Sequence, residues 1–283
     1  MHDTDDIFSA AGPLARALPG YRPRRVQSVM ARHVADALEA RRPLIVEAGT
    51  GTGKTFAYLV PALLSGRRVL VSTGTRTLQD QLFAKDVPLV AAALGRPAAI
   101  ALLKGRSNYL CRERFLRLGA QRSLGGVEAG PSRELARIER WAEVTATGDL
   151  AEVPGFSDTH PLWPQITSTR DNCLGQRCGE YARCHVVQAR REAQEADLVV
   201  VNHHLLLADL ALKQDGFGDL LGTADAVILD EAHQIPDLAT AFFGSSIGSR
   251  QVENLLADGS AAAAGARAPG APTDDAHEAA TSA

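Results

Sequence analysis

The sequence predicts an α/β fold in which helices cover a parallel sheet. Short apolar runs of four or five residues recur along the chain, which is typical of strands buried on both faces. Amphipathic helical stretches separate these runs, so strands and helices alternate. The 283 residues are 45% hydrophobic and 22% charged, which is the composition of a globular protein with a sizeable core.

The elements follow one another in a regular order until one long interruption. Strands are expected at 44–48, 69–72, 99–103, 198–201 and 226–229, and helices at 26–40, 55–64 and 77–84. Between 111 and 185 no apolar strand occurs. This stretch holds a charged helical segment at 132–144 and a loop rich in Pro, Gly and Cys. A connection of that length is either functional or a small inserted domain.

These patterns predict four parts. We expect an N-terminal extension at 1–20, a core domain formed by 21–110 and 186–256, an insertion at 111–185 and a tail at 257–283. In the tail 12 of 27 residues are Ala, and Val, Ile, Leu, Met and aromatic residues are absent. Such a segment buries too little apolar surface to offset the entropy of ordering, so we expect disorder there.

A glycine-rich loop follows the first predicted strand and precedes a helix, which is the context of a phosphate-binding P-loop. Its glycines let backbone N–H groups surround a phosphate at a helix N-terminus. Lys54 would reach the β- and γ-phosphate oxygens, and the Thr55 hydroxyl would bind Mg²⁺. The loop comprises Ala48, Gly49, Thr50, Gly51, Thr52, Gly53, Lys54 and Thr55, with Ala48 standing where the stricter pattern has Gly.

Two carboxylates follow the last predicted strand, at Asp230 and Glu231. The carboxyl end of a strand is where open α/β sheets bind ligands. Asp230 would hold Mg²⁺ through water and Glu231 would polarise the water that attacks the γ-phosphate. The structural alternative is a helix N-cap with a favourable dipole contact.

The chain has four cysteines, Cys111, Cys173, Cys178 and Cys184, of which three are clustered and one is distant. Four thiolates can close a tetrahedral site for Zn²⁺ or an iron–sulfur cluster, and spacing does not choose between them. Unrelated buried thiols are a third possibility. His185 is a spare ligand candidate, although we expect a surface histidine there.

The net charge is −3, but the charged residues are unevenly distributed along the sequence. Seven basic residues and one acid lie between Arg96 and Arg122, and seven arginines lie between Arg16 and Arg42. These segments are candidates for phosphate contacts with a nucleic acid, with Tyr109 available to stack on a base. A solvated basic face is the alternative, because Arg is abundant throughout the chain.

Cell location is also constrained by the sequence. The start is acidic where a signal peptide would be basic, and no apolar stretch approaches 18 residues. We therefore expect a soluble, cytoplasmic protein that makes no membrane contact.

The motifs together resemble those of the XPD-like iron–sulfur helicases of superfamily 2, in the DinG/YoaA branch. The P-loop is similar to motif I, and Asp230-Glu231-Ala232-His233 is a DEAH box like motif II. The other similar segments are Arg24–Gln27, Ser72–Leu82, Lys104–Cys111 and Val201–Leu205. The resemblance covers about residues 20–253, with six motifs in the family's order.

This resemblance implies a RecA-like domain carrying an inserted iron–sulfur domain, in an ATP-dependent 5′-to-3′ DNA helicase of repair. It implies ATP, Mg²⁺ and a [4Fe-4S] cluster held by the four cysteines, with Gln27 at the adenine. Partners would be single-stranded or forked DNA and repair or replication proteins, and we expect a monomer. Residues near DNA or in coupling would be Thr73, Arg76, Arg106, Tyr109, Asn202 and His233.

Such helicases also need a second RecA-like domain, and none is recognisable after Glu253. One expectation is therefore the N-terminal part of a longer helicase. The alternative is a nucleotide- and DNA-binding module that turns over poorly unless a second motor domain is supplied in trans. In both cases we expect weak ATP hydrolysis by these 283 residues, because the arginine that stabilises the transition state is missing.

Overall fold

The computed structural model describes residues 4–49, 51–124, 133–214, 216, 219–244 and 256. Contacts group the chain into one compact unit, Met1–Phe242, and a second unit, Phe243–Ala283. The predicted tail at 257–283 lies outside the described residues, as does Thr50 of the P-loop. The fold described below is that of the first unit.

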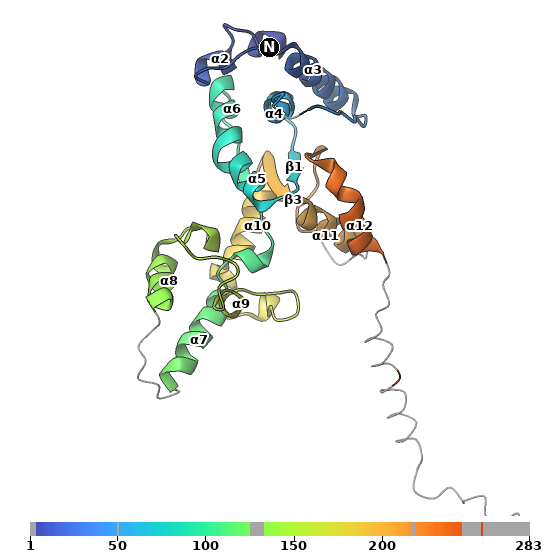
Figure 1. Cartoon of the computed structure of the whole chain (residues 1–283). Coiled ribbons are helices and arrows are strands. Elements are labelled where there is room, and N and C mark those ends of the chain that lie inside the picture. Colours follow the sequence, from blue (N-terminus) through green and yellow to red (C-terminus); the bar gives the residue numbers. More distant parts are fainter. Residues whose placement is uncertain are drawn as a thin grey trace, which may run out of the picture. The chain divides into compact units, whose positions relative to one another are not determined.

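A four-stranded parallel sheet forms the centre of this unit (Figure 1). Its strands are β1 (Val69–Thr73), β2 (Ile100–Leu102), β3 (Leu198–Asn202) and β4 (Ala226–Leu229), in the order β2-β3-β1-β4. All three neighbouring pairs are parallel. The predicted α/β class is therefore confirmed, together with four of the five predicted strands.

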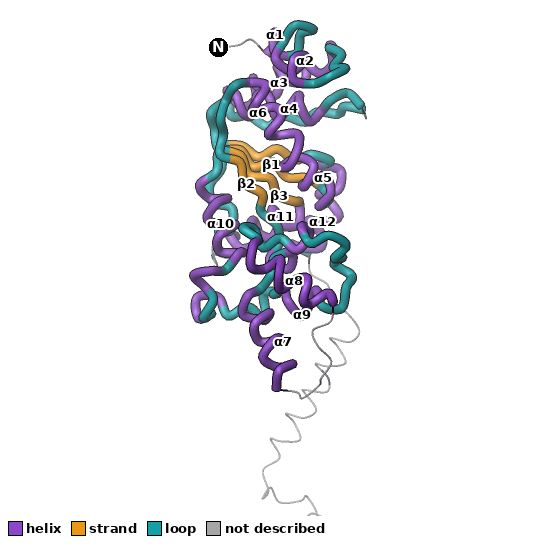
Figure 2. Tube along the Cα trace, turned by 90° about the vertical axis from the view of Figure 1, so that its left-hand side faces the viewer, coloured by secondary structure: helices purple, strands orange, loops and turns teal. Residues whose placement is uncertain are grey.

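Alternate residues of the central strands enter two separate cores. Val69 and Val71 of β1 pack with helices α3 and α4 on one face, whereas Leu70 faces the other core. The same alternation occurs in β3, as expected for a pleated strand covered on both sides. Figure 2 shows the strands lying between these helical layers.

Helices account for most of the remaining described residues. Those outside the insertion are α1 (Thr4–Ile7), α2 (Pro13–Ala17), α3 (Arg25–Ala40), α4 (Lys54–Leu64), α5 (Arg76–Gln81), α6 (Val87–Leu94), α10 (His185–Glu195), α11 (His203–Gln214) and α12 (Ile235–Phe243). A π-helical turn, η1 (Leu82–Asp86), joins α5 to α6. The helices predicted at 26–40, 55–64 and 77–84 are confirmed, although η1 replaces the end of the third.

The insertion contains helices α7 (Arg112–Leu124), α8 (Arg133–Val144) and α9 (Trp163–Ile166) and builds a third apolar cluster of its own. Ile138 of α8 and Leu150 are fully buried in it, beside the partly exposed ring of Trp141. No strand occurs among the described residues of 111–185. The boundaries assigned to the insertion remain predictions.

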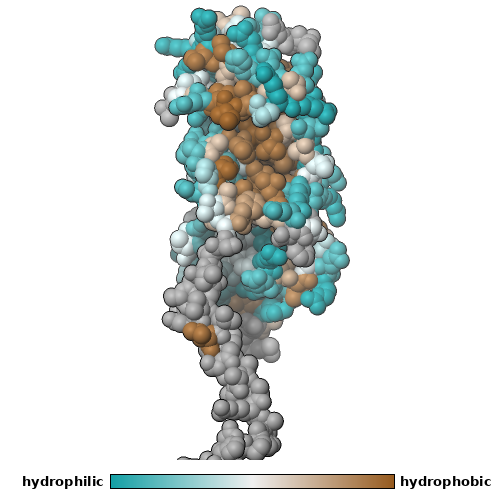
Figure 3. Space-filling model, turned by 90° about the vertical axis from the view of Figure 1, so that its right-hand side faces the viewer, coloured by the Kyte–Doolittle hydropathy of each residue, from teal (hydrophilic) through white to brown (hydrophobic). Residues whose placement is uncertain are grey.

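The strand predicted at 44–48 is wrong. Leu44, Ile45 and Val46 form no strand and are exposed, Ile45 by 97%. An apolar run becomes a strand only where a neighbour pairs its backbone, and none of the sheet's pairings includes these residues. β4 is consequently an edge strand with Val227 and Leu229 half exposed. Figure 3 shows apolar surface on the side of the molecule that carries β4 and α12.

None of the helices in the described ranges combines the length and the apolar character that crossing a membrane would require.

Candidate functional site

The glycine-rich loop ends at the N-terminus of α4, with Gly53 as the N-cap residue at φ +84°. Gly51 also has a positive φ, +74°, whereas Gly49 does not. A Cβ at Gly49 or Gly51 would meet no atom within 4 Å, so the described part of the loop leaves space beside it. The loop is braced internally by the Thr52 hydroxyl, which donates to the Gly49 carbonyl (2.8 Å).

Helix α3 holds this loop in place through Gln27. The Gln27 Nε2 donates to the Gly53 carbonyl (3.0 Å), and the Tyr21 hydroxyl donates to Gln27 Oε1 (3.0 Å). Arg24 donates to the Gly51 carbonyl. A Cβ at Gly53 would collide with the Gln27 side chain, and the positive φ of Gly53 also favours glycine there. Gln27, expected at the adenine, is nearly buried and contacts the loop itself.

The two carboxylates after β4 lie against the start of α4. The Lys54 ammonium is 3.1 Å from Glu231 Oε1, and the Tyr58 hydroxyl donates to Asp230 Oδ2 (3.2 Å). Thr55, the predicted Mg²⁺ ligand, is next to Lys54 and its side chain contacts Tyr58. Residues separated by more than 170 positions therefore meet at the carboxyl end of the sheet.

Burial is the main cause of the unusual electrostatics here. It raises the pKa of Asp230 above the ordinary value, and the neighbouring Glu231 carboxylate adds to this rise. Burial also raises the pKa of Tyr58, which stays a neutral donor. A cation beside Asp230 and Glu231 would relieve their mutual repulsion, so this pair is suited to binding one.

The backbone of the DEAH segment is bonded to the neighbouring strand. Asp230 N–H donates to the Ser72 carbonyl (2.8 Å). Glu231 has a left-handed conformation, φ 56° and ψ 42°, which is uncommon for a residue other than glycine. His233 is exposed, and its Nδ1 is 3.5 Å from Glu231 Oε2. The N-cap alternative for these carboxylates has no support, because the side chain of Glu231 caps no helix.

The four cysteines are free thiols on the surface of the insertion. Cys178 and Cys184 each follow a 3₁₀ turn, Gly175–Arg177 and Tyr181–Arg183. Glu180 between them accepts a hydrogen bond from Arg112 (3.1 Å), which ties this loop to the residue after Cys111.

The four cysteines are close enough for electrostatic interaction. Burial raises the pKa of Cys111, and the other three thiols raise it further. The donor set suits a soft metal in type and number. However, the described residues contain no group of three or more side chains already at metal-binding separations. His185 is buried with both ring nitrogens unpaired, so the prediction of a surface histidine is wrong.

The predicted DNA or coupling residues occupy different environments. Tyr109 is 3% exposed and its hydroxyl accepts the Lys104 N–H (3.0 Å), so the prediction that it stacks on a base is wrong. Its ring is buried in the core beside β2 and α10. Thr73 is fully buried at the end of β1, so it is not accessible to a strand of DNA as placed.

Arg76, Arg106 and Asn202 complete this set. Arg76 at the start of α5 pairs with Asp158 of the insertion (2.9 Å). Arg106 is partly exposed on the segment before Cys111. Asn202 Oδ1 accepts the Leu205 N–H (2.8 Å) and thus caps the first turn of α11.

Lys104 is one of the basic residues that the sequence made candidates for phosphate contacts, but it is a buried cation at the junction of core and insertion. Its ammonium lies 2.6 Å from Asp80 of α5 and 2.7 Å from Asp149 of the insertion. These two hydrogen bonds and charges outweigh burial and raise the pKa of Lys104. The signal in the sequence was a lysine in a chain where nearly every other cation is arginine.

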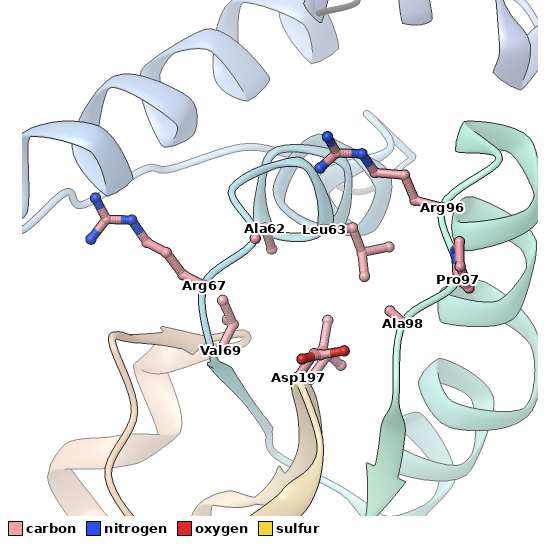
Figure 4. A pocket seen from close by; sticks show the side chains of 10 residues that line it. Ala62, Leu63, Arg67, Val69, Arg96, Pro97, Ala98 and Asp197 are labelled. Atoms are coloured by element: carbon pink, nitrogen blue, oxygen red, sulfur yellow. The ribbon is translucent and has the colours of Figure 1, made fainter.

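A cavity of about 340 Å³ lies at the opposite end of the sheet, at the amino ends of β1 and β3. Asp197, Val69 and Leu63 line it (Figure 4). The Arg67 guanidinium extends away from it, whereas that of Arg96 reaches α4 and donates to the Leu64 carbonyl (2.9 Å). This cavity is therefore separate from the P-loop and its carboxylates, which meet at the carboxyl ends.

Comparison with known proteins matches a family model to the region that contains the P-loop. The DEAD/DEAH box helicase model matches residues 25–115. The chain is 48% identical over 253 residues to the ATP-dependent DNA helicase YoaA of Haemophilus influenzae, covering 89% of this chain and 39% of that protein.

Two further relatives agree with this result. Identity to the ATP-dependent DNA helicase YoaA of Escherichia coli is 48% over 257 residues, covering 90% of this chain and 40% of the relative. Identity to the ATP-dependent helicase DinG of Mycobacterium tuberculosis is 36% over 261 residues, covering 82% of this chain and 37% of the relative. The chain thus spans about two fifths of the length of these relatives.

Proposed function

The chain contains a DEAD/DEAH box helicase domain of the DinG/YoaA-like family, and from this we propose that it is the ATP-binding part of a DNA helicase. The observation that carries the proposal is the meeting of Lys54 with Glu231 and of Tyr58 with Asp230. It brings a phosphate-binding loop and two carboxylates together at one end of the sheet. This is the arrangement that nucleotide hydrolysis requires.

Each group at this site has a role that its position supports. Backbone N–H groups of residues 49–54 and the N-terminus of α4 would bind the phosphates. Lys54 would leave Glu231 for the γ-phosphate, which would free the Glu231 carboxylate to orient the attacking water. Thr55 and Asp230 would hold Mg²⁺, which neutralises charge on the β- and γ-phosphate oxygens. Gln27 would act by fixing the loop at Gly53 and by contacting the adenine.

The cysteine set supports a [4Fe-4S] cluster as the second cofactor, with structural Zn²⁺ as the alternative. Cys111, Cys173, Cys178 and Cys184 would hold either one, and binding would draw the four thiols together as thiolates. An iron–sulfur cluster bound there could give electron-transfer chemistry, whereas Zn²⁺ would only fix the fold of the loop.

The substrate would be single-stranded or forked DNA, and movement would be 5′ to 3′ in DNA repair in the cytoplasm. Arg76, Arg106 and the basic helix α7 are candidates for phosphate contacts. Asn202, Thr73 and His233 would transmit the nucleotide state, because they lie at the strand ends and the DEAH segment. The second candidate function is a binding module that needs another motor domain in trans for turnover.

Nucleotide binding is tested by titrating the purified chain with Mg·ATP in a calorimeter. The Lys54→Ala variant should lose binding, because no other cation contacts the carboxylates at this end of the sheet among the described residues. Lys85→Ala is the matched control, since Lys85 is exposed on η1 and should leave affinity unchanged. Equal affinity in all three proteins would rule out the proposed site.

The choice between the two functions depends on turnover. ATP hydrolysis is measured with and without single-stranded DNA of defined length. Hydrolysis that DNA stimulates strongly would favour a self-sufficient motor. Binding of both ligands with hydrolysis near background would favour a module that needs a second domain, because transition-state charge then lacks its arginine, a loss of about 10³-fold or more.

Cofactor identity is tested by anaerobic purification with iron, sulfide and zinc analysis. A brown protein absorbing near ~400 nm with stoichiometric iron and sulfide would support the cluster. A colourless protein containing zinc would replace it with the alternative. Cys173→Ser should abolish either metal, whereas Ser168→Ala in the same insertion should not.

A further inference from the structure

A second cavity, of about 300 Å³, lies along the edge of the sheet that β2 forms. In the described sheet β2 pairs with β3 alone, and α10 lies beside it (Figure 2). All three residues of β2, Ile100, Ala101 and Leu102, line the cavity. Its volume is at the lower end of the range for ligand pockets, roughly 300–1,000 Å³. Since β2 and β4 are opposite edges of the sheet, this cavity is separate from the ATP site.

The backbone of β2 has hydrogen-bonding groups that the sheet does not use. The Leu103 N–H donates to the Val200 carbonyl (3.0 Å), and the Ala99 carbonyl accepts the Leu198 N–H (3.1 Å). These directions alternate along a strand, so residues 99, 101 and 103 face β3. The N–H and C=O groups of Ile100 and Leu102 consequently face the open edge. Such a row of groups is a template for pairing with another extended chain.

The cavity is bordered from both faces of the sheet. Phe83 lines it from η1, whose Leu82 packs in the core that also holds α3 and α4. Tyr109 and Ala189 line it from the other core. The space between these walls therefore lies beyond the outer edge of β2, where an added strand would lie.

The polar part of the lining is acidic. Glu192 belongs to α10, and Glu152 follows Asp149, which bridges to Tyr109 on the same face of the sheet. Each of these two glutamates accepts a hydrogen bond from a neutral side chain and, in the described part of the chain, forms no ion pair. Asp149 is already paired with Lys104. Two carboxylates thus remain for a cationic ligand, and no lysine or arginine of the described ranges lines the cavity.

His185 is the buried polar side chain of this lining. It is 6% exposed, and both of its ring nitrogens are buried without a hydrogen-bond partner in the described structure. A buried polar group without a partner destabilises a protein. A polar ligand that reached this ring would therefore be stabilised by supplying the missing hydrogen bond.

We propose that the β2 edge is a docking site for an extended segment of a partner protein in which basic and apolar residues alternate. The segment would pair its backbone with Ile100 and Leu102. Because side chains of a strand alternate between its two faces, the basic residues would meet Glu152 and Glu192 while the apolar residues meet Phe83. A second copy of this chain is a poorer occupant, since pairing two β2 edges would bring like charges together.

The test uses fluorescein-labelled seven-residue peptides and the full chain, with binding followed by fluorescence anisotropy. A peptide that alternates valine and lysine should bind saturably, and a version with glutamate in place of lysine should not. Two further versions carry backbone N-methyl groups, either on the lysines or on the valines. Only one of these sets faces β2 in a paired strand, so one version should lose about 10-fold in affinity and the other little.

Variants of the protein test the charge complementarity. The double variant Glu152→Gln/Glu192→Gln should weaken binding of the lysine peptide about 5-fold. Glu195→Gln is the matched control, because Glu195 is exposed on α10 but does not line the cavity. Unchanged affinity in the double variant, or an equal loss in the control, would overturn the assignment of the basic residues to this rim.

Three other outcomes would overturn the docking site itself. They are no saturable binding of the lysine peptide, equal binding of the lysine and glutamate peptides, and equal affinities of the two N-methylated versions. Analytical ultracentrifugation gives a further check, because dimers that exclude the peptide would assign the edge to a second copy of this chain instead of a partner.

Discussion

The contribution of an ion pair to stability depends on its burial. Lys104 bridges Asp80 and Asp149, whereas Arg32 pairs with Asp5. The Lys104 side chain is 2% exposed and that of Arg32 is 52% exposed. Removing a buried cation leaves its partners' charge uncompensated, whereas removing one partner of a solvated pair costs little.

Lys104→Met should therefore reduce the free energy of unfolding by about 3–5 kcal/mol. Arg32→Met is the control and should cost no more than about 1 kcal/mol, because Arg32 and Asp5 are both about half exposed. Urea denaturation of both variants gives the comparison. Equal losses would mean that Lys104 is better hydrated than its position indicates.

The buried histidines predict a pH dependence of stability. Burial lowers the pKa of His203 in the folded state, so the unfolded chain binds more protons below the ordinary value near 6.5. The contribution of the neutral His203 ring to the free energy of unfolding is thus complete above about pH 6.5 and is lost as the pH falls below that value. The melting temperature should drop between pH 7.5 and 5.5, and the drop should be smaller in His203→Gln. An identical drop in both proteins would assign the effect to other groups.

Among the helices and loops, two pairs of segments come into close contact at a glycine. α3 meets the P-loop where Gln27 lies against Gly53, and α12 begins beside Gln234, whose side chain lies against Gly74. At each contact a glycine provides the space that a Cβ would fill. The positive φ of Gly53 adds a second requirement for glycine at that position.

Gly53→Ala should lower both stability and ATP affinity, because the new Cβ would displace Gln27 and strain the backbone. Gly20→Ala separates the two effects, since Gly20 also has a positive φ (+78°) but open space around it. The control should lose about 1–2 kcal/mol from strain alone and keep its ATP affinity. Thermal unfolding and calorimetry measure both quantities. Unchanged ATP affinity in Gly53→Ala would show that Gln27 adjusts freely.

At the scale of the whole unit, core domain and insertion are linked by charge pairs on α5. Asp80 meets Lys104, which also binds Asp149, and Arg76 meets Asp158. α5 begins two residues after the end of β1, so these pairs join the carboxyl end of β1 to the insertion. The Arg76 pair also holds a cation that DNA phosphate would otherwise attract.

Asp158→Ala should release Arg76 and strengthen binding of single-stranded DNA. The slope of log affinity against log salt should become steeper by about 0.7 if Arg76 gains one phosphate contact. Fluorescence anisotropy of a labelled oligonucleotide across a salt series measures this. Glu139→Ala removes one negative charge at an exposed position of α8 in the insertion and serves as the control. A similar change in both variants would indicate a general charge effect.

Local patterns in the sequence are enough to predict the alternation of strands and helices, the P-loop, the DEAH carboxylates and the cysteine set. These features can be predicted because apolar periodicity and glycine spacing are properties of residues that are close together in the sequence. Reasoning from the same local patterns wrongly predicts a strand at 44–48, since an apolar run does not specify whether a neighbouring strand will pair with it.

Which distant residues meet depends on how the chain folds. The fold puts Tyr109 into a core instead of on the surface, pairs Arg76 with Asp158, and brings Lys104 between two aspartates. It also connects His203 to the Asp230 backbone through Ser72. Burial and pairing are properties of three-dimensional contacts between segments far apart in the chain, and the energy of a polar residue depends on those contacts.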